Sequence, residues 1–444
     1  MISTNQKISH YLDAFQKVEN SLLGNEIPWL KQFRAKAIAE FENLGFPSTQ
    51  DEDWRFTEIE TITNKKFDLP AKEETDYQKN EIHGSLLGHC SPDKIQLTFI
   101  NGIFKEDFSK NIKNLPSGLK IKNFKSMIKD EPKTLEKYFN SFERLDSDGF
   151  SLLNDAFFND GLFISLSKGA VLKDEIYLNF ITHSSHKDPV VYPRLLCFAD
   201  RDSELNLVEL NLGEVPLNYL ALSASELICA ENSKINYCKV QKESSSGFHL
   251  AKIRAQVQRN SRFYSHSIAL GGSMVRNNLN VALAEEGAEC VLNGLYLASG
   301  QELIDNHTQI EHLKPHTTSR ELYKGILNGK SKAVFNGSIL VHANAQKTDA
   351  LQTNKNLLLS QDCHIHTKPG LKIFANDVKC KHGATVGQMD QDVLFYLRSR
   401  GIPKEEAQKL LIVAFASEII DQIQLETFQN QLTPILFTTL MGKN

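Results

Sequence analysis

Two stripes of apolar residues open the chain, each with the three- and four-residue steps of an amphipathic helix. The first stripe consists of Ile8, Tyr11, Leu12, Phe15, Val18 and Leu22, and the second of Leu30, Phe33, Ala37, Ile38, Phe41 and Leu44. The second stripe stops at Gly45, with Pro47 shortly behind it, which is typical of a helix end. The pattern predicts an N-terminal helical region, a hairpin or short bundle, over residues 1–60.

Residues 61–150 have mixed patterning and one clear turn signal. Two apolar runs, Ile95–Phe99 and Ile103–Phe104, flank the dipeptide Asn101-Gly102. Asn-Gly is a preferred sequence for the tight turn of a β-hairpin. We therefore predict a mixed α/β connecting region that contains one hairpin.

From about residue 150 the pattern becomes strand-like and repetitive. A small residue recurs at the corners, usually after Gly, Asn or Asp: Ala170, Ser203, Ser233, Ser261, Ala288, Ser331 and Cys363. These residues are 33, 30, 28, 27, 43 and 32 positions apart. Apolar residues tend to fill the second and fourth places after each corner, as Leu205 and Leu207 do, which indicates a strand with one buried face.

Such units bury a continuous core only when they stack. The sequence therefore predicts a mainly β fold, a parallel β-helix over residues 151–388, with two short coils in each repeat. A two-sheet sandwich also alternates, but its turns should recur every 8–12 residues or so. The pattern favours the β-helix.

The chain returns to helix in a C-terminal region over residues 389–444. Val393–Leu397 leads to a stop at Gly401, and Pro403 opens a second helix. Within that helix the segment Leu410–Ala416 is apolar on every side, so it has to be covered all round. Either its own domain or a partner protein could cover it.

Composition narrows the function classes. The 444 residues carry 54 acidic and 50 basic side chains, a net charge of −4, so nucleic acid is a poor electrostatic match. No apolar run is long enough to span a bilayer, and Met1–Glu19 is too polar for a secretory signal. We expect a cytoplasmic protein. Its seven scattered cysteines argue against a disulfide framework.

Several apparent motifs do not hold up. Gly325–Ser331 resembles a phosphate-binding loop, but it has three residues between its glycines where four are needed, and a strand pattern follows it. No nucleophile motif of the Gly-x-Ser-x-Gly type is present. A carbohydrate-active β-helix enzyme would need paired carboxylates, and Glu285 and Glu286, being adjacent, would point to opposite faces of a strand.

Most histidines lack the neighbours that a metal site requires. Pro315 disfavours a helix that would bring His312 and His316 together, so we expect these and His307 to be surface or loop residues. His364 and His366 take outward places on their coil, and neither has a third ligand nearby. His83 and His89, beside Cys90, are expected in a loop.

Cys380 and His382 are the strongest candidates for metal chemistry. They lie two residues apart in the segment Asp377–Gly387, where the strand-rich region ends, so on a strand they face the same way. A thiolate beside an imidazole suits iron or zinc. A buried thiol next to a hydrogen-bonded histidine would show the same pattern, and the residues alone leave both readings open. The pair is only half a site.

Longer motifs lie in segments 318–320, 333–337, 357–369, 371–375, 377–387 and 394–402, with a weaker element at Asp53–Thr57. In these segments the chain resembles the SufD family, scaffold subunits of the SUF system for iron–sulfur cluster assembly. The related SufB family places a cysteine where this chain has Ile373–Ala375, and it flanks the histidine with glutamate where this chain has Lys381 and Gly383. Both differences favour SufD.

The resemblance implies a right-handed β-helix between helical regions, and a non-catalytic subunit of an ATPase-driven complex. It implies a SufB-like partner along the β-helix and a SufC-like ATPase on the C-terminal helices, and it leaves open whether the isolated chain is a homodimer or a monomer. His382 and Cys380 would bind iron or a transient cluster shared with SufB, and the complex could carry a flavin. The residues expected to bind the ATPase are Leu394, Tyr396, Arg398, Arg400, Leu411 and Phe415. A purely structural adaptor without an iron ligand remains the alternative.

Overall fold

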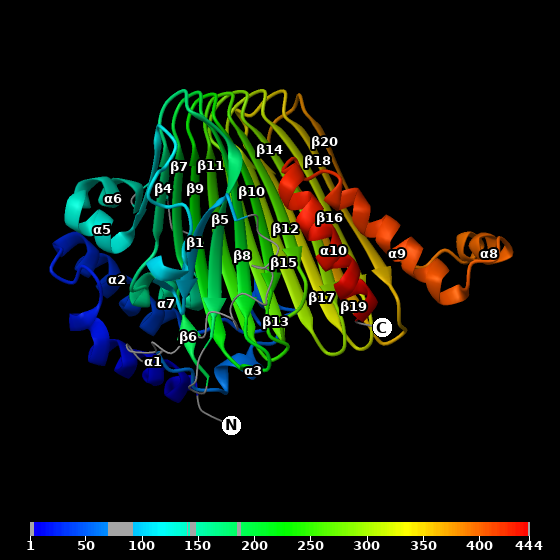
Figure 1. Cartoon of the computed structure of the whole chain (residues 1–444), viewed down its shortest axis with the longest axis horizontal. Helices are drawn as coiled ribbons and strands as arrows, with labels where there is room; N and C mark the ends of the chain where they lie inside the picture. Colours follow the sequence, from blue (N-terminus) through cyan, green and yellow to red (C-terminus); the bar gives the residue numbers. More distant parts are fainter. Residues whose placement is uncertain (1–3, 70–91, 140, 143–147, 184–187, 443–444) are drawn as a thin grey trace.

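The computed structural model describes residues 4–69, 92–139, 141–142, 148–183 and 188–442, and its central feature is a parallel β-solenoid built from two long sheets (Figure 1). Sheet I runs in the order β2 (Ile103–Phe104), β1 (Ile95–Ile100), β5 (Val171–Thr182), β8 (Glu204–Gly213), β10 (Lys234–Lys242), β12 (Arg262–Ala269), β14 (Glu289–Ala298), β16 (Thr318–Leu327), β18 (Asp349–Leu358), β20 (Lys379–Gln388). Sheet II runs in the order β19 (His364–Ile373), β17 (Lys332–Val341), β15 (Leu303–His312), β13 (Met274–Leu283), β11 (Phe248–Val257), β9 (Leu220–Cys229), β7 (Arg194–Ala199), β4 (Leu162–Leu166), β3 (Leu119–Asn123), with β6 (Val190–Val191) beside β9. The predicted parallel β-helix is confirmed.

Each turn of the solenoid consists of one strand from each sheet. Lys234 of β10 pairs with Glu204 of β8, so the chain returns to the same sheet after about 30 residues. The prediction of two short coils per repeat is therefore wrong: one repeat is a single coil with two long strands. The small residues mark only one corner per turn. The sequence pattern therefore did not show that each repeat of about 30 residues contains two long strands in a single coil.

The irregular spacing of 43 residues has a simple structural cause. Ala288 precedes a strand of sheet I, whereas Ser331 precedes a strand of sheet II. The corners of sheet I continue instead through Thr317 and Thr348, which lie 29 and 31 residues further on. His316, just before Thr317, adopts the left-handed backbone conformation with φ 58°. A histidine at this corner hides the Gly or Asn signal that marks most of the others.

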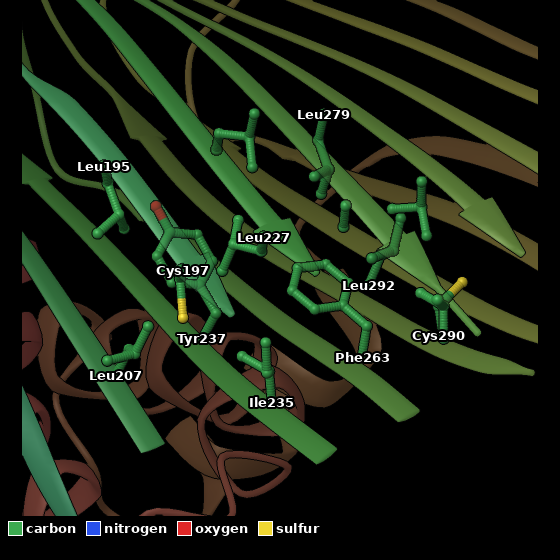
Figure 2. Close-up of a cluster of buried hydrophobic side chains, with 14 of the residues drawn as sticks. Leu195, Cys197, Leu207, Leu227, Ile235, Tyr237, Phe263, Leu279, Cys290 and Leu292 are labelled. Carbon is green, nitrogen blue, oxygen red and sulfur yellow. The ribbon is translucent and has the colours of Figure 1, made fainter. Parts of the chain in front are cut away.

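The core of the solenoid lies between the two sheets, where the inward side chains of each strand meet (Figure 2). Leu207, Tyr237 and Phe263 are fully buried there, as are Cys197 and Cys290. Alternate residues on each strand point inward because the side chains of a strand alternate between its faces. The described cysteines are free thiols, as expected without a disulfide framework.

Helices cover one end of the solenoid and the outer face of neighbouring strands of sheet II (Figure 1). They are α1 (Thr4–Val18), α2 (Pro28–Leu44), α3 (Glu60–Thr63), α5 (Phe124–Asp130), α6 (Pro132–Phe139) and α7 (Gly149–Phe157). The two predicted N-terminal helices are confirmed, and α2 ends at Gly45 with φ 66°. The predicted hairpin is also present, as β1 and β2. Since β1 pairs in parallel with β5, this hairpin extends sheet I.

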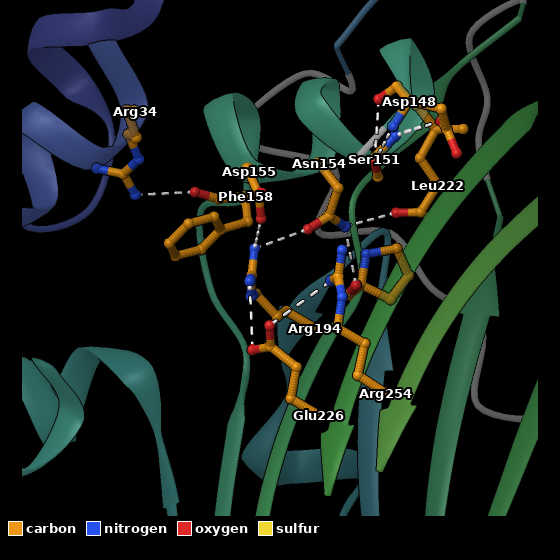
Figure 3. A network of polar contacts seen from close by, with 11 residues as sticks. Arg34, Asp148, Ser151, Asn154, Asp155, Phe158, Arg194, Leu222, Glu226 and Arg254 are labelled. Atoms are coloured by element: carbon orange, nitrogen blue, oxygen red, sulfur yellow. Dashed lines mark hydrogen bonds and ion pairs between the residues drawn. The ribbon is translucent and has the colours of Figure 1, made fainter. Parts of the chain in front are cut away.

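A buried polar network attaches this helical cap to the sheets (Figure 3). Arg194 of β7 is 1% exposed and forms ion pairs with Asp155 of α7 at 2.6 Å and with Glu226 of β9 at 3.4 Å. Asn154 donates a hydrogen bond to the Leu222 carbonyl, at 2.6 Å. A buried guanidinium is tolerated only with such partners, so the network fixes α7 on the first turns of sheet II.

The segment Asp53–Thr57 makes a second attachment, on the outer face of sheet II. The Thr57 hydroxyl donates to the Asp305 carboxylate at 2.6 Å, and Asp305 also pairs with Arg276. The Arg276 guanidinium lies 3.7 Å from the centre of the Trp54 ring, a cation–π geometry. Trp54 and Thr57 are therefore structural anchors.

Three helices end the chain: α8 (Gln391–Ser399), α9 (Lys404–Ile420) and α10 (Glu426–Gly442). Helix α10 and the second half of α9 pack on the outer face of sheet I, whereas α8 projects beyond the last strands (Figure 1). Ile412 and Ala416 are buried against the sheet, but Leu410 is 51% exposed. The segment Leu410–Ala416 is thus covered on one side only, not all round as its sequence predicted.

Candidate functional site

The end of the solenoid opposite the helical cap is open. Strands β19 and β20 are the last strands of the two sheets, and within the described residues each is paired on one side only. Almost every residue of β20 is exposed. Unpaired backbone N–H and C=O groups at such edges can pair with another chain. The open end is therefore a ready-made pairing surface.

Cys380 and His382 both lie on β20 and face the interior at this open end. In the sheet register Cys380 pairs with Ala350 and His382 pairs with Gln352. Ala350 and Gln352 are both buried inside the solenoid, so their partners on β20 share that face. Cys380 is half-buried against the core, whereas His382 is exposed. The expectation that the two side chains point the same way is met by the register.

The surroundings of Cys380 keep its thiol protonated. Burial raises the thiol pKa, and the nearby Asp349 carboxylate raises it further, against a backbone hydrogen bond with Ala350 that lowers it. The thiolate is the form that binds metal. The raised pKa favours the protonated thiol over the thiolate.

Two donors cannot close a coordination sphere. Within the ranges that the structure describes, no three or more His, Cys, Asp or Glu residues gather to hold a metal ion. A thiol and an imidazole suit iron chemically, but four ligands are the usual number for iron–sulfur and zinc sites. The pair is half a site by geometry as well as by sequence.

The other histidines serve the fold. His312 was expected at the surface or in a loop, and this was wrong: it is fully buried, within hydrogen-bond distance of the Thr317 and Ser319 hydroxyls at 2.8 and 3.0 Å. Burial lowers its pKa to about 4, so it stays neutral. His307, on β15 rather than in a loop, lies 3.0 Å from Asp305, and His316 forms a corner. His366 is exposed and stacks on Phe56. His83, His89 and Cys90 lie outside the described residues.

Two polar residues behind His382 were not predicted from the sequence. Gln352 and Glu321 occupy the next two inward positions in the same register row, on β18 and β16. Both are buried. Alternation predicts that a position faces inward but not that it is polar, so neither residue was singled out.

The residues expected to bind a partner ATPase divide into three groups. Tyr396, Arg398 and Arg400 are exposed on α8 or just after it. Leu394 is only 4% exposed and holds α8 in place instead of presenting a free surface. Leu411 and Phe415 of α9 are half-buried and line a groove shared with Val386 and Gly387 of β20.

Helix α9 is fixed to sheet I by one acidic residue. Glu418 pairs with Lys324 at 2.6 Å and with Lys355 at 3.2 Å. The Lys324 ammonium also lies 3.9 Å from the centre of the Phe415 ring. These contacts hold the second half of the helix, and the first half continues beyond the sheet toward α8.

Comparison with known proteins gives a consistent result. Residues 180–415 match the SufBD core domain of the SUF system for iron–sulfur cluster assembly, and residues 5–178 match the SufBD protein N-terminal region. A SufBD family iron–sulfur cluster assembly protein of Synechocystis is 32% identical over 94% of this chain and 92% of its own length. The iron–sulfur cluster assembly protein SufD of Escherichia coli is 29% identical over 91% of this chain and 92% of its own length.

SufD of Bacillus subtilis is 25% identical over 96% of both chains. The resemblance inferred from the motifs is therefore confirmed. An enzyme acting on carbohydrates was suggested by the solenoid alone, and the family match removes that ground. Among the described residues, no helix combines the length and apolar composition that a membrane crossing requires.

Proposed function

Because this chain belongs to the SufBD family of the SUF system for iron–sulfur cluster assembly, we propose that it is a SufD-type scaffold subunit that completes a metal site together with a SufB-like partner. The observation that carries the proposal is the position of Cys380 and His382. They form half a site on the last strand of an open solenoid end. The missing ligands, a thiolate and a carboxylate, come from the partner.

The exposed edges support pairing with a second solenoid. Phe374, directly after β19, is 67% exposed, and Val386 on β20 is 47% exposed. Apolar side chains beside unpaired strand edges favour association with another sheet. The homologous SufB-like subunit is the proposed partner in the complex, and a second copy of this chain takes its place when the chain is isolated.

The subunit has a binding role, not a catalytic one. Iron and sulfide are its cargo: His382 binds iron through a ring nitrogen, and Cys380 gives up its proton as the metal arrives. The assembled complex could also hold a flavin. A SufC-like ATPase docks on the exposed part of α8 and on the groove along α9, and its ATP hydrolysis moves the helices and opens the subunit interface to iron and sulfide.

The test compares cluster content in the co-expressed three-subunit complex. We expect His382→Ala to reduce the iron and sulfide that purify with the complex, and Cys380→Ser to reduce them less. His366→Ala is the matched control, because His366 is also an exposed histidine on a last strand but faces outward. Iron and sulfide at wild-type level in His382→Ala would refute the ligand role and leave the structural adaptor.

A further inference from the structure

One row of inward positions in sheet I changes from apolar to polar as it approaches the open end. In register order it contains Leu292 on β14, Glu321 on β16, Gln352 on β18 and His382 on β20. Leu292 belongs to the apolar core between the sheets. Glu321 and Gln352 are 3% and 0% exposed. Two polar side chains thus fill core positions directly behind the proposed iron ligand.

The two buried residues hold each other in one arrangement. Gln352 Nε2 donates a hydrogen bond to Glu321 Oε2 at 2.7 Å. The side chain reaches across the interior toward sheet II, since a Cβ on Gly337 of β17 would lie only 2.3 Å from Gln352 Nε2. The glycine therefore makes room for the amide. With one N–H directed to the carboxylate, the amide keeps its oxygen as its acceptor.

That oxygen is an unused acceptor. Gln352 Oε1 is buried and has no hydrogen-bond partner among the described residues. A buried polar atom without a partner is destabilising by about 1–3 kcal/mol, so its presence calls for an explanation. The next residue in the row is His382, on a neighbouring strand about 4.8 Å away. An imidazole N–H at this neighbouring position would supply the donor that the acceptor lacks.

We propose that Gln352, oriented by Glu321, is a positioning residue that accepts the N–H of His382 and so directs the opposite ring nitrogen outward to the metal. The inference rests on the proposed function of His382. A histidine that binds a metal usually donates its other ring N–H to a carbonyl or carboxylate, which fixes the tautomer and the ring orientation. Gln352 offers that carbonyl from inside the fold, so the partner subunit does not have to provide it.

The test measures which tautomer of His382 is present in the full-length chain without metal. The ring nitrogens are observed by NMR with ¹⁵N-histidine at about pH 8.5, above the ordinary histidine pKa, and the His382 signals are identified from a His382→Ala sample. We expect one tautomer to predominate in the wild type. Gln352→Met, which keeps the side-chain size, should shift the tautomer ratio about five-fold, the effect of losing one hydrogen bond.

Gly337→Ala provides a second perturbation that leaves the amide intact. Its new methyl group displaces the end of a flexible side chain, so it should move Gln352 and shift the ratio in the same direction. Asn354→Leu is the control: Asn354 is a buried polar residue on the same strand, bonded to Tyr296 at 3.1 Å, but its partner on β20 is Ala384. It should destabilise the fold and leave the tautomer unchanged.

Co²⁺ added alone gives an independent measurement. We expect the broadening of the His382 ring signals to require about ten-fold more Co²⁺ in Gln352→Met than in the wild type, the usual loss when such a supporting group is removed. An unchanged tautomer ratio in both Gln352→Met and Gly337→Ala would overturn the inference. That result would leave the ligand role standing, whereas wild-type cluster content in the His382→Ala complex would refute the ligand role itself.

Discussion

Glu321 offers a sharp test of the polar interior, because its carboxyl group lies where the solenoid is otherwise apolar. Burial raises the pKa of Glu321 from 4.5 to about 7, and hydrogen bonds from Thr308 and Gln352 only partly oppose this. Replacing the residue by Gln removes the ionisable group and keeps an oxygen that can accept from Gln352. The substitution therefore isolates the energy of placing a charge at this position.

The raised pKa of Glu321 determines whether the folded chain gains or loses stability as the pH rises. Below about pH 4.5 the carboxyl is protonated in both the folded and the unfolded chain, so it makes no difference to the pH dependence. As the pH rises from 4.5 to about 7, the unfolded chain loses this proton first, and the folded chain becomes progressively less stable relative to it. The gap between 4.5 and about 7, at about 1.36 kcal/mol per pH unit, amounts to about 3 kcal/mol.

The assay is urea unfolding of the wild type and Glu321→Gln between about pH 4.5 and pH 8, followed by circular dichroism of the sheet. Other titrating groups are common to both proteins, so they cancel in the difference. We expect the variant to gain about 3 kcal/mol on the wild type across this range. A difference between Glu321→Gln and the wild type that stays constant over this pH range would refute the reasoning.

Two further predictions concern the ion pair between Asp305 and Arg276 on sheet II and the exposed surface of helix α8. Asp305→Asn leaves Arg276 buried and without its ion pair, so it should lower the free energy of unfolding by about 3 kcal/mol. The control Asp377→Asn breaks an exposed pair with Lys347 and should lower it by about 0.5 kcal/mol or less. Urea unfolding measures both variants, and equal effects would contradict the role of the Arg276 pair. Tyr396→Asp on α8 should reduce the amount of ATPase subunit that co-purifies with the complex at least ten-fold, without reducing the SufB-like subunit. Gel densitometry measures both subunits, and Lys36→Asp on α2 is the control that should leave both amounts unchanged. Unchanged recovery of the ATPase subunit in Tyr396→Asp would show that α8 is not part of the docking surface.

The sequence predicted the architecture well because its signals were local. Helix periodicity, the glycine at position 45 and the Asn-Gly turn each depend on a few neighbouring residues. The recurrence of small residues predicted stacking for the same reason. It could not show that one repeat is one coil, because strand pairing joins residues about 30 positions apart, and the series passed from one sheet to the other between Ala288 and Ser331.

The site was harder to predict than the fold. Cys380 and His382 were proposed from the sequence because a thiol and an imidazole are unusual neighbours with a known chemistry. Glu321 and Gln352 were missed, since a polar residue at an inward place looks like an ordinary break in the alternation. The exposure of Leu410 was missed as well, because an apolar helix predicts that a cover is needed and does not say whether the same chain provides it.

The two ends of the solenoid differ in a way that sets how large an assembly can become. Each sheet has an edge strand at both ends, but β2 and β3 lie close to the helical cap, whereas β19 and β20 have no such cover among the described residues. Such a chain corresponds to a monomer with one reactive group, because only its open end can pair with another solenoid. Joining two open ends consumes both reactive groups, so end-to-end growth stops at a pair, where a solenoid open at both ends would continue into a fibre.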